Sequence, residues 1–134
     1  MLKNIFDKFK KNNTPSPEPS SVFSLQENVI NELIINTPKE WDRILLNFEY
    51  FLWDGDYIEK YQGFAFNSEE KEQIDPTLET FDELIVLNKE MAKLNPEPWT
   101  HCEILLNSSG KYEFNYKYGI PPFTKQMLEN IGEI

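Results

Sequence analysis

The sequence has few of the residues that support extracellular or membrane proteins. Cys102 is the only cysteine, so the chain cannot form an internal disulfide bond. It has no run of about 18 apolar residues, the length that a membrane-spanning helix needs. Lys8, Lys10 and Lys11 interrupt the apolar residues of the N-terminus, so we expect no export signal. These absences favour a reducing, cytoplasmic location.

Glycine and basic side chains are also scarce. The five glycines form no phosphate-binding or dinucleotide-binding loop and no nucleophile elbow. The 13 basic side chains face 23 acidic ones, which gives a net charge of -10 and disfavours the phosphate backbone of nucleic acid as a partner. We therefore expect a protein that is not an enzyme and that has no cofactor, no small-molecule substrate and no bound nucleic acid.

His101 and Cys102 are the only adjacent pair with a possible base and nucleophile. Neighbouring residues of a strand point to opposite faces, so the two side chains cannot readily activate each other. We expect one of them to pack inward beside Ile104 and the other to lie on the wetter face. One histidine and one cysteine could bind zinc only with added carboxylates, and no ligand spacing indicates such a site.

The N-terminal 21 residues differ in composition from the rest. Leu2, Ile5, Phe6 and Phe9 recur at helical spacing among lysines, which predicts a short basic amphipathic helix over residues 1–11. It could bind a membrane surface or a partner, or dock on its own domain. Residues 12–21 form a linker rich in proline and serine. Residues 22–134 are long enough for one domain with a substantial core.

Three helices are predicted within that domain. Ser24 to Glu27 match a capping box, and the stripe that follows is Leu25, Val29, Ile30, Leu33 and Ile34. Asp75-Pro76 predicts an N-cap and first turn for a helix that extends to Leu94. Its apolar face comprises Leu78, Phe81, Leu84, Ile85, Leu87, Met91 and Leu94. Pro121-Pro122 begins a short last helix that carries Met127, Leu128 and Ile131.

Two hairpins complete the pattern. Residues 41–53 alternate with period two, Asp54-Gly55 is typical of a type I′ turn, and residues 56–66 return as a strand in which Gly63 suggests a bulge. Residues 67–73 are too charged to pack and are predicted as a loop. Residues 99–106 and 111–118 flank a turn at 107–110, and the aromatic side of the second strand should form the floor of the core through Tyr112, Phe114, Tyr116 and Tyr118.

This order, ααββαββα, predicts an α+β fold. The two hairpins would form an antiparallel sheet of about four strands, with the helices packed on one face. Tyrosines such as Tyr57 and Tyr61 are expected to pack within the sheet, because base stacking normally requires a positively charged groove.

Charge is unevenly distributed along the chain. Residues 12–134 contain nine basic and 22 acidic side chains, a net charge of -13. Between residues 49 and 83, eleven acidic side chains face only Lys60 and Lys71, a net charge of -9. Such a segment is either an ordinary solvated face or the contact surface of a basic partner, whose approach its field would accelerate.

The chain resembles the YezG-like immunity proteins, cytosolic antidotes encoded beside toxins of bacterial polymorphic-toxin and contact-dependent inhibition systems. The resemblance rests on Glu97-Pro98-Trp99-Thr100, on Ser109-Gly110-Lys111 and on the aromatic alternation over residues 112–116. It extends from about Trp41 to Tyr118. Residues 1–21 and the basic end of the last strand depart from the family pattern.

The resemblance implies tight binding to a cognate toxin domain, often a basic nuclease, and no catalytic residues. We therefore predict an immunity protein that neutralises such a toxin through an acidic surface. The alternatives are an adaptor that docks through its N-terminal basic helix and, less favoured, an enzyme that uses His101. The predicted partner-binding residues are Asp54, Asp56, Glu59, Glu69, Glu70, Glu72, Asp75, Glu79, Asp82 and Glu83.

Overall fold

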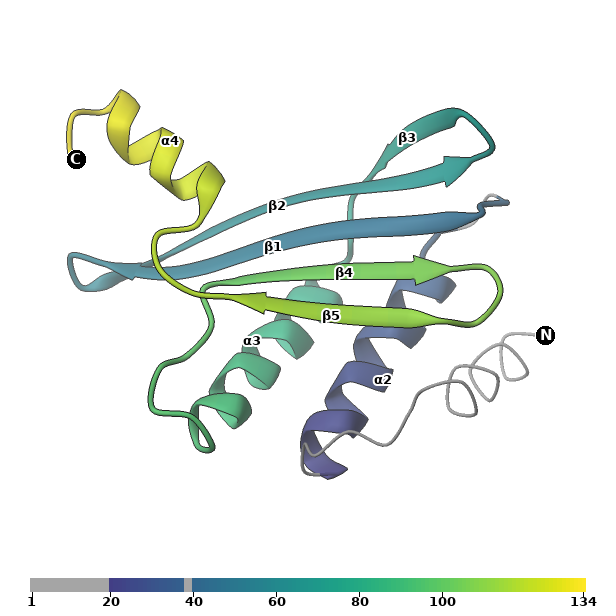
Figure 1. Cartoon of the computed structure of the whole chain (residues 1–134), viewed down its shortest axis with the longest axis horizontal. Helices are drawn as coiled ribbons and strands as arrows, with labels where there is room; N and C mark the ends of the chain where they lie inside the picture. The colour runs from purple at the N-terminus through teal and green to yellow at the C-terminus, as the bar shows by residue number, and fades with distance from the viewer. Residues whose placement is uncertain (1–19, 38–39) are drawn as a thin grey trace.

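The computed structural model describes residues 20–37 and 40–134, so the predicted N-terminal helix and most of the linker lie outside the described residues. The described elements are α2 (Ser20–Ile35), β1 (Arg43–Trp53), β2 (Asp56–Asn67), β3 (Glu70–Ile74), α3 (Leu78–Ala92), β4 (His101–Asn107), β5 (Tyr112–Lys117) and α4 (Pro122–Asn130). The α+β class and the antiparallel sheet are confirmed. The sheet has five strands, in the order β3-β2-β1-β4-β5 (Figure 1).

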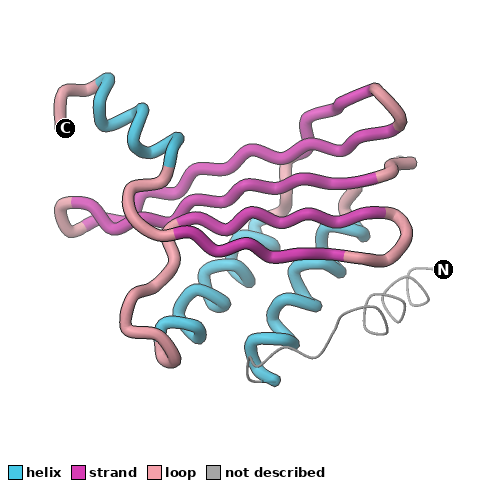
Figure 2. Tube along the Cα trace, in the orientation of Figure 1, coloured by secondary structure: helices cyan, strands magenta, loops and turns pink. Residues whose placement is uncertain are grey.

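The core lies between this sheet and the pair α2 and α3, which cover one face (Figure 2). In β1 the alternate residues Ile44, Leu46, Phe48 and Tyr50 are buried, as a half-buried strand requires. Trp99, just before β4, is also buried, and its backbone oxygen accepts a hydrogen bond of 2.7 Å from Asn88 Nδ2 of α3. We call this side of the sheet the helix-side face.

The first hairpin forms as predicted, apart from the bulge. Asp54 and Gly55 both have positive φ, at 52° and 86°, which confirms the type I′ turn. The pairing of β1 with β2 is unbroken around Gly63, so the predicted bulge is wrong. Gly63 is needed for close approach instead, because a Cβ atom there would lie 2.9 Å from Ile74 Cγ1 of β3.

The prediction of a loop over residues 67–73 is wrong, because residues 70–74 form β3. This strand pairs with the end of β2, from Gly63 opposite Ile74 to Asn67 opposite Glu70. Its charged side chains do not alternate with apolar ones, so the sequence shows no strand pattern here. An edge strand nevertheless needs little burial, and charge on an edge discourages pairing with other chains. The predicted count of about four strands is therefore one too few.

Two predicted helix starts are wrong. The helix α2 begins at Ser20 rather than after Ser24, because Val22 is buried and extends the same apolar stripe by one turn. The N-cap of α3 is Thr77, whose Oγ1 accepts from the Thr80 amide at 3.3 Å. Asp75 instead accepts a hydrogen bond from the Tyr61 hydroxyl.

The apolar face of α3 is narrower than predicted. Thr80, Leu84, Leu87 and Asn88 are buried, and Phe81, Ile85 and Met91 pack against the core from the margin. Leu78 and Leu94 are exposed, contrary to the prediction. Leu78 is the first residue of the helix, and Leu94 follows its last residue, Ala92, so neither continues the buried stripe.

The second hairpin is confirmed as β4 and β5. Tyr112, Phe114 and Tyr116 pack against the core, and the Tyr116 hydroxyl accepts from Gln26 Nε2 of α2 at 2.7 Å. Tyr118 lies beyond the last residue of β5 and is exposed, so it does not belong to the floor of the core.

The last helix contradicts the prediction that all helices share one face. The carboxylate of Glu49 accepts hydrogen bonds from the backbone amides of Phe123 and Thr124, at 2.8 and 2.7 Å. Glu49 alternates with Phe48 and Tyr50, which face the core, so its side chain points to the opposite face. Thus α4 is held on the side of the sheet away from α2 and α3.

Candidate functional site

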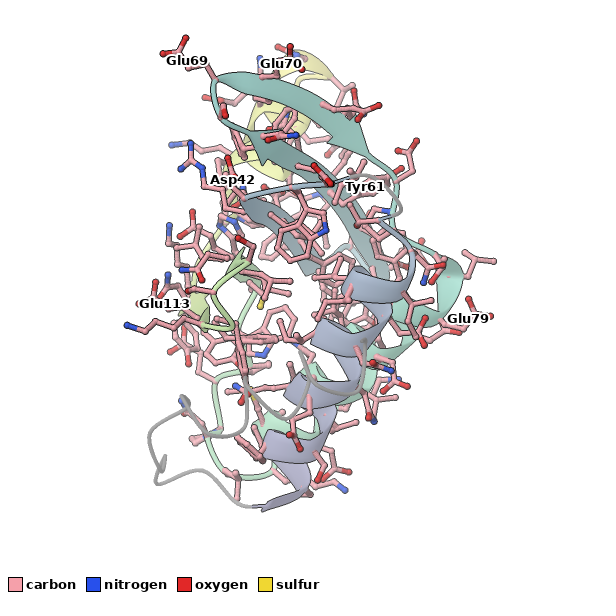
Figure 3. The ribbon with its side chains drawn as sticks, turned by 90° about the vertical axis from the view of Figure 1, so that its right-hand side faces the viewer. Asp42, Tyr61, Glu69, Glu70, Glu79 and Glu113 are labelled. Carbon is pink, nitrogen blue, oxygen red and sulfur yellow. The ribbon has the colours of Figure 1, made fainter. Side chains whose placement is uncertain are left out.

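The structure places nine of the ten predicted partner-binding carboxylates on the surface, and Glu83 is half-buried. Asp54 and Asp56 flank the turn between β1 and β2, and Glu59 lies on β2. Glu69, Glu70 and Glu72 belong to the β2–β3 turn and β3, which Figure 3 shows projecting from one end of the molecule. Asp75 precedes α3, and α3 carries Glu79, Asp82 and Glu83.

These carboxylates do not form one cluster. The turn that carries Asp54 and the turn that carries Glu69 lie at opposite ends of β2, a strand of 12 residues. At roughly 3.3 Å per residue, the two ends are about 40 Å apart. A standard interface of about 800 Å² per partner is roughly 30 Å across, so one contact of that size cannot include both turns.

A groove of about 550 Å³ lies beside β3. Its walls carry four carboxylates and one lysine, namely Glu40, Glu70, Glu72, Asp75 and Lys71. The remaining lining comes from Gln73 and Ile74 of β3, from the end of β2, and from Asn36 and Thr37. Glu40 was not among the predicted residues. The antiparallel register could have indicated it, because Arg43 at the start of β1 pairs with Phe66 at the end of β2, close to Glu70 in the chain.

Tyrosine side chains line the helix-side face of β2 next to these acids. The Tyr61 hydroxyl donates to Asp75 Oδ1 at 3.0 Å, and this hydrogen bond raises the pKa of Tyr61. Tyr57 stacks on Tyr50, with ring centroids 4.2 Å apart and planes 5° from parallel. Burial, with Tyr57 and Glu59 nearby, raises the pKa of Tyr50. The phenols of Tyr50 and Tyr61 therefore stay neutral at physiological pH.

His101 and Cys102 lie on opposite faces of the sheet, as predicted. Cys102 is buried in the core, and this burial raises the pKa of its thiol well above the ordinary value, so it is a poor nucleophile. The ring of His101 is buried on the other face, with Nε2 2.8 Å from Asn47 Oδ1. Burial lowers the His101 pKa, although Glu49 opposes this shift. The pair forms no nucleophile and base.

Two other kinds of site are absent from the described residues. Within residues 20–37 and 40–134, no three histidine, cysteine or carboxylate side chains are grouped so that they could hold a metal ion. Over the same ranges, no helix is both long and apolar enough to cross a bilayer. The exposed acidic and aromatic side chains therefore carry the surface chemistry of the described part of the chain.

Comparison with known proteins supports the family resemblance. No family model matches the chain. Immunity protein YezG of Bacillus spizizenii (strain ATCC 23059 / NRRL B-14472 / W23) is 26% identical over an alignment of 119 positions, and the match covers 77% of this chain and 70% of that protein. The chain is therefore a distant homologue of an immunity protein, and this homology suggests an immunity role.

Proposed function

We propose that this protein is a cytoplasmic, non-catalytic immunity protein that binds and neutralises a cognate toxin domain. The partner would be basic, as a nuclease is, because a nuclease must hold the phosphates of nucleic acid. The observation that carries this proposal is the exposure of the acidic side chains along β2, β3 and the first turns of α3. The homology to Immunity protein YezG gives the class of function.

The arrangement of the carboxylates suggests a division of labour. The groove beside β3 gathers Glu40, Glu70, Glu72 and Asp75, and the opposite turn carries only Asp54 and Asp56. The charges along the molecule create a field that attracts and orients a basic partner at distances up to about a Debye length, roughly 8 Å at physiological salt. Because the β3 end has more carboxylates than the opposite turn, we assign long-range steering to the β3 end.

Co-expression tests the function. The toxin domain encoded beside this gene should arrest bacterial growth when expressed alone, and this protein should restore growth and copurify with it in equal amounts. Absence of both protection and copurification with that domain would refute the immunity proposal.

A charge reversal tests the steering. The triple variant Glu69→Lys, Glu70→Lys and Glu72→Lys should slow association by about tenfold or more at low salt and should weaken its salt dependence. The matched control reverses the exposed residues Glu113, Glu129 and Glu133, which gives the same change in net charge away from β3. Equal association rates for the two variants would contradict a specific role of the β3 end.

A further inference from the structure

The helix-side face of the sheet is not covered along its whole length. Along β1 the buried row Ile44, Leu46 and Phe48 continues to Tyr50 and then to Leu52, which is 53% exposed. On β2 the residue paired with Leu52 is Tyr57, 52% exposed. Figure 1 shows the β1–β2 hairpin extending past the ends of α2 and α3. Apolar residues thus remain where the helices end.

The exposed side chains of this region adjoin α3. Tyr61 is 42% exposed, although its ring lies 4.8 Å from that of Phe81 in α3. Leu78, the first residue of α3, is 78% exposed. We call the four side chains Leu52, Tyr57, Tyr61 and Leu78 the tyrosine patch. Exposed apolar side chains that gather on one face beside polar residues mark protein contact sites more often than ordinary surface.

The two tyrosine rings are held in place before any partner binds. Tyr57 is stacked on the buried Tyr50, and the Tyr61 hydroxyl is bonded to Asp75. Tyrosine has few rotatable bonds, so ordering it in an interface costs little entropy, and restraint by neighbours lowers that cost further. Such fixed aromatic side chains are typical of the residues that dominate binding energy.

The carboxylates that border the tyrosine patch favour a positively charged partner. Glu59 lies between Tyr57 and Tyr61 on the same side of β2. Asp75 accepts the hydrogen bond of the Tyr61 hydroxyl, and Glu79 follows Leu78 in α3. Lys60 is paired with Glu49 and therefore points to the opposite face. A cationic side chain placed over a tyrosine ring here would meet both the ring and a carboxylate.

The opposite face already contains this kind of contact. The Arg43 guanidinium carbon lies 4.1 Å from the centroid of the Phe66 ring, and Lys71 Nζ lies 4.3 Å from that of Phe64. There the cation and the ring belong to the same chain. On the tyrosine patch the rings and the acids are present, and a basic partner would supply the cation.

We propose that the tyrosine patch is the contact site for the basic surface of the toxin domain, with arginine or lysine side chains of the toxin lying over Tyr57 and Tyr61. This inference rests on the proposed function and deepens it, because it separates the contact site from the β3 end that steers. The spacing of Tyr57 and Tyr61, about 13 Å at 3.3 Å per residue, matches two basic side chains rather than one.

The first test uses peptides, so that it does not depend on the toxin. Arginine-rich, lysine-rich and glutamate-rich peptides of equal length are titrated into the full chain, and NMR follows the tyrosine ring signals and the backbone amide signals. The two basic peptides should shift Tyr57 and Tyr61 and leave Tyr118, which is 45% exposed, unchanged. Shifts confined to residues 69–72, or equal shifts at Tyr118, would overturn the proposal.

The second test uses the toxin domain carrying an inactivating substitution. The double variant Tyr57→Ala and Tyr61→Ala should raise the Kd by about tenfold or more, mainly through faster dissociation. The double variant to Phe keeps both rings and should stay within a few-fold, as should Tyr118→Ala. A folding defect in the Ala pair would also weaken binding. Adding Glu59→Lys to the Phe pair provides a second test, because this variant keeps both rings and should still bind more weakly.

The outcomes separate the two proposals. If the wild-type chain does not bind the toxin domain, the proposed function fails. If it binds but the Ala pair binds equally well, only the tyrosine patch is refuted. Two results would assign the patch to another occupant and overturn the inference. One is a concentration-dependent dimer that the Ala pair abolishes. The other is a shift of the Tyr57 and Tyr61 signals when Lys3, Lys8, Lys10 and Lys11 are replaced by Gln without any partner.

Discussion

The two edge strands of the sheet, β3 and β5, differ in how many of their side chains pack against the core. In β5 one side of the strand is aromatic, and Tyr112, Phe114 and Tyr116 all pack against the core. In β3 only Ile74 does so, and the other side chains are charged or amide groups in solvent. The comparison indicates that β5 stabilises the fold, whereas β3 is free to present charge. A set of substitutions tests this contrast.

The largest effect is expected on the β5 side, at Trp99. Its ring stacks on that of Tyr116 with centroids 5.7 Å apart and meets Phe48 edge-on at 6.4 Å. Trp99→Ala leaves a cavity beside Tyr116 and Phe48 and should lower the free energy of unfolding by about 3 to 5 kcal/mol. Chemical denaturation measures this loss. A cost below about 1 kcal/mol would contradict the assignment of β5 to the core.

On the β3 side, crowding at Gly63 should have a smaller and more local effect. Gly63→Val places side-chain atoms against Ile74 and should cost about 1 to 3 kcal/mol. Hydrogen exchange should show faster exchange in β3 and little change in β5. Adding Ile74→Ala provides room and should recover part of the loss. If the double variant is less stable than either single variant, close packing at this site is not the cause.

The hydrogen bond between Tyr116 and Gln26 links β5 to α2. Tyr116→Phe removes the acceptor of the Gln26 amide in a part-buried position and should cost about 1 kcal/mol. The matched control, Tyr118→Phe, alters an exposed tyrosine outside the strand and should change the midpoint of denaturation very little. Similar losses for the two variants would show that this bond does not stabilise the β5 side.

The smallest effect on stability is expected for the acids of β3. Glu70→Thr together with Glu72→Thr replaces exposed residues of the edge strand by good strand formers, and stability should change by no more than about 0.5 kcal/mol per site. Light scattering should show more self-association than for the wild-type chain, because charge no longer protects the edge. A marked loss of stability would show that β3 stabilises the fold as β5 does.

The contrast between the packed strand β5 and the exposed strand β3 also appears in what could be predicted from the sequence. The alternation over residues 112–116 and the Asp54-Gly55 turn were detectable because burial and positive φ each restrict the residue type. The strand β3 was missed because its side chains need no apolar partner. The start of α2 was missed because Val22, one turn before the capping sequence, is ordered by tertiary packing.

The candidate site could be predicted only in part from the sequence. Composition placed the acids in residues 49–83, but their separation at the two ends of β2 depends on strand length and register. Tyr57 and Tyr61 were expected to pack within the sheet. Both rings do pack, Tyr57 on Tyr50 and Tyr61 against Phe81 of α3, but each stays partly exposed. That partial exposure depends on where the helices end, and helix coverage cannot be derived from the pattern of a strand.

Glu49 links β1 to the start of α4, a segment that is synthesised much later. Its buried carboxylate is bonded to the Phe123 and Thr124 amides and to the Thr124 hydroxyl, all more than 70 positions later in the chain. Until those donors have been synthesised, a strand in the middle of the sheet carries a carboxyl group without the hydrogen-bond partners that it has in the native state. The centre of the sheet is therefore complete only when the C-terminal helix is present, and a chain cut before Pro122 should leave the buried Glu49 side chain without these donors.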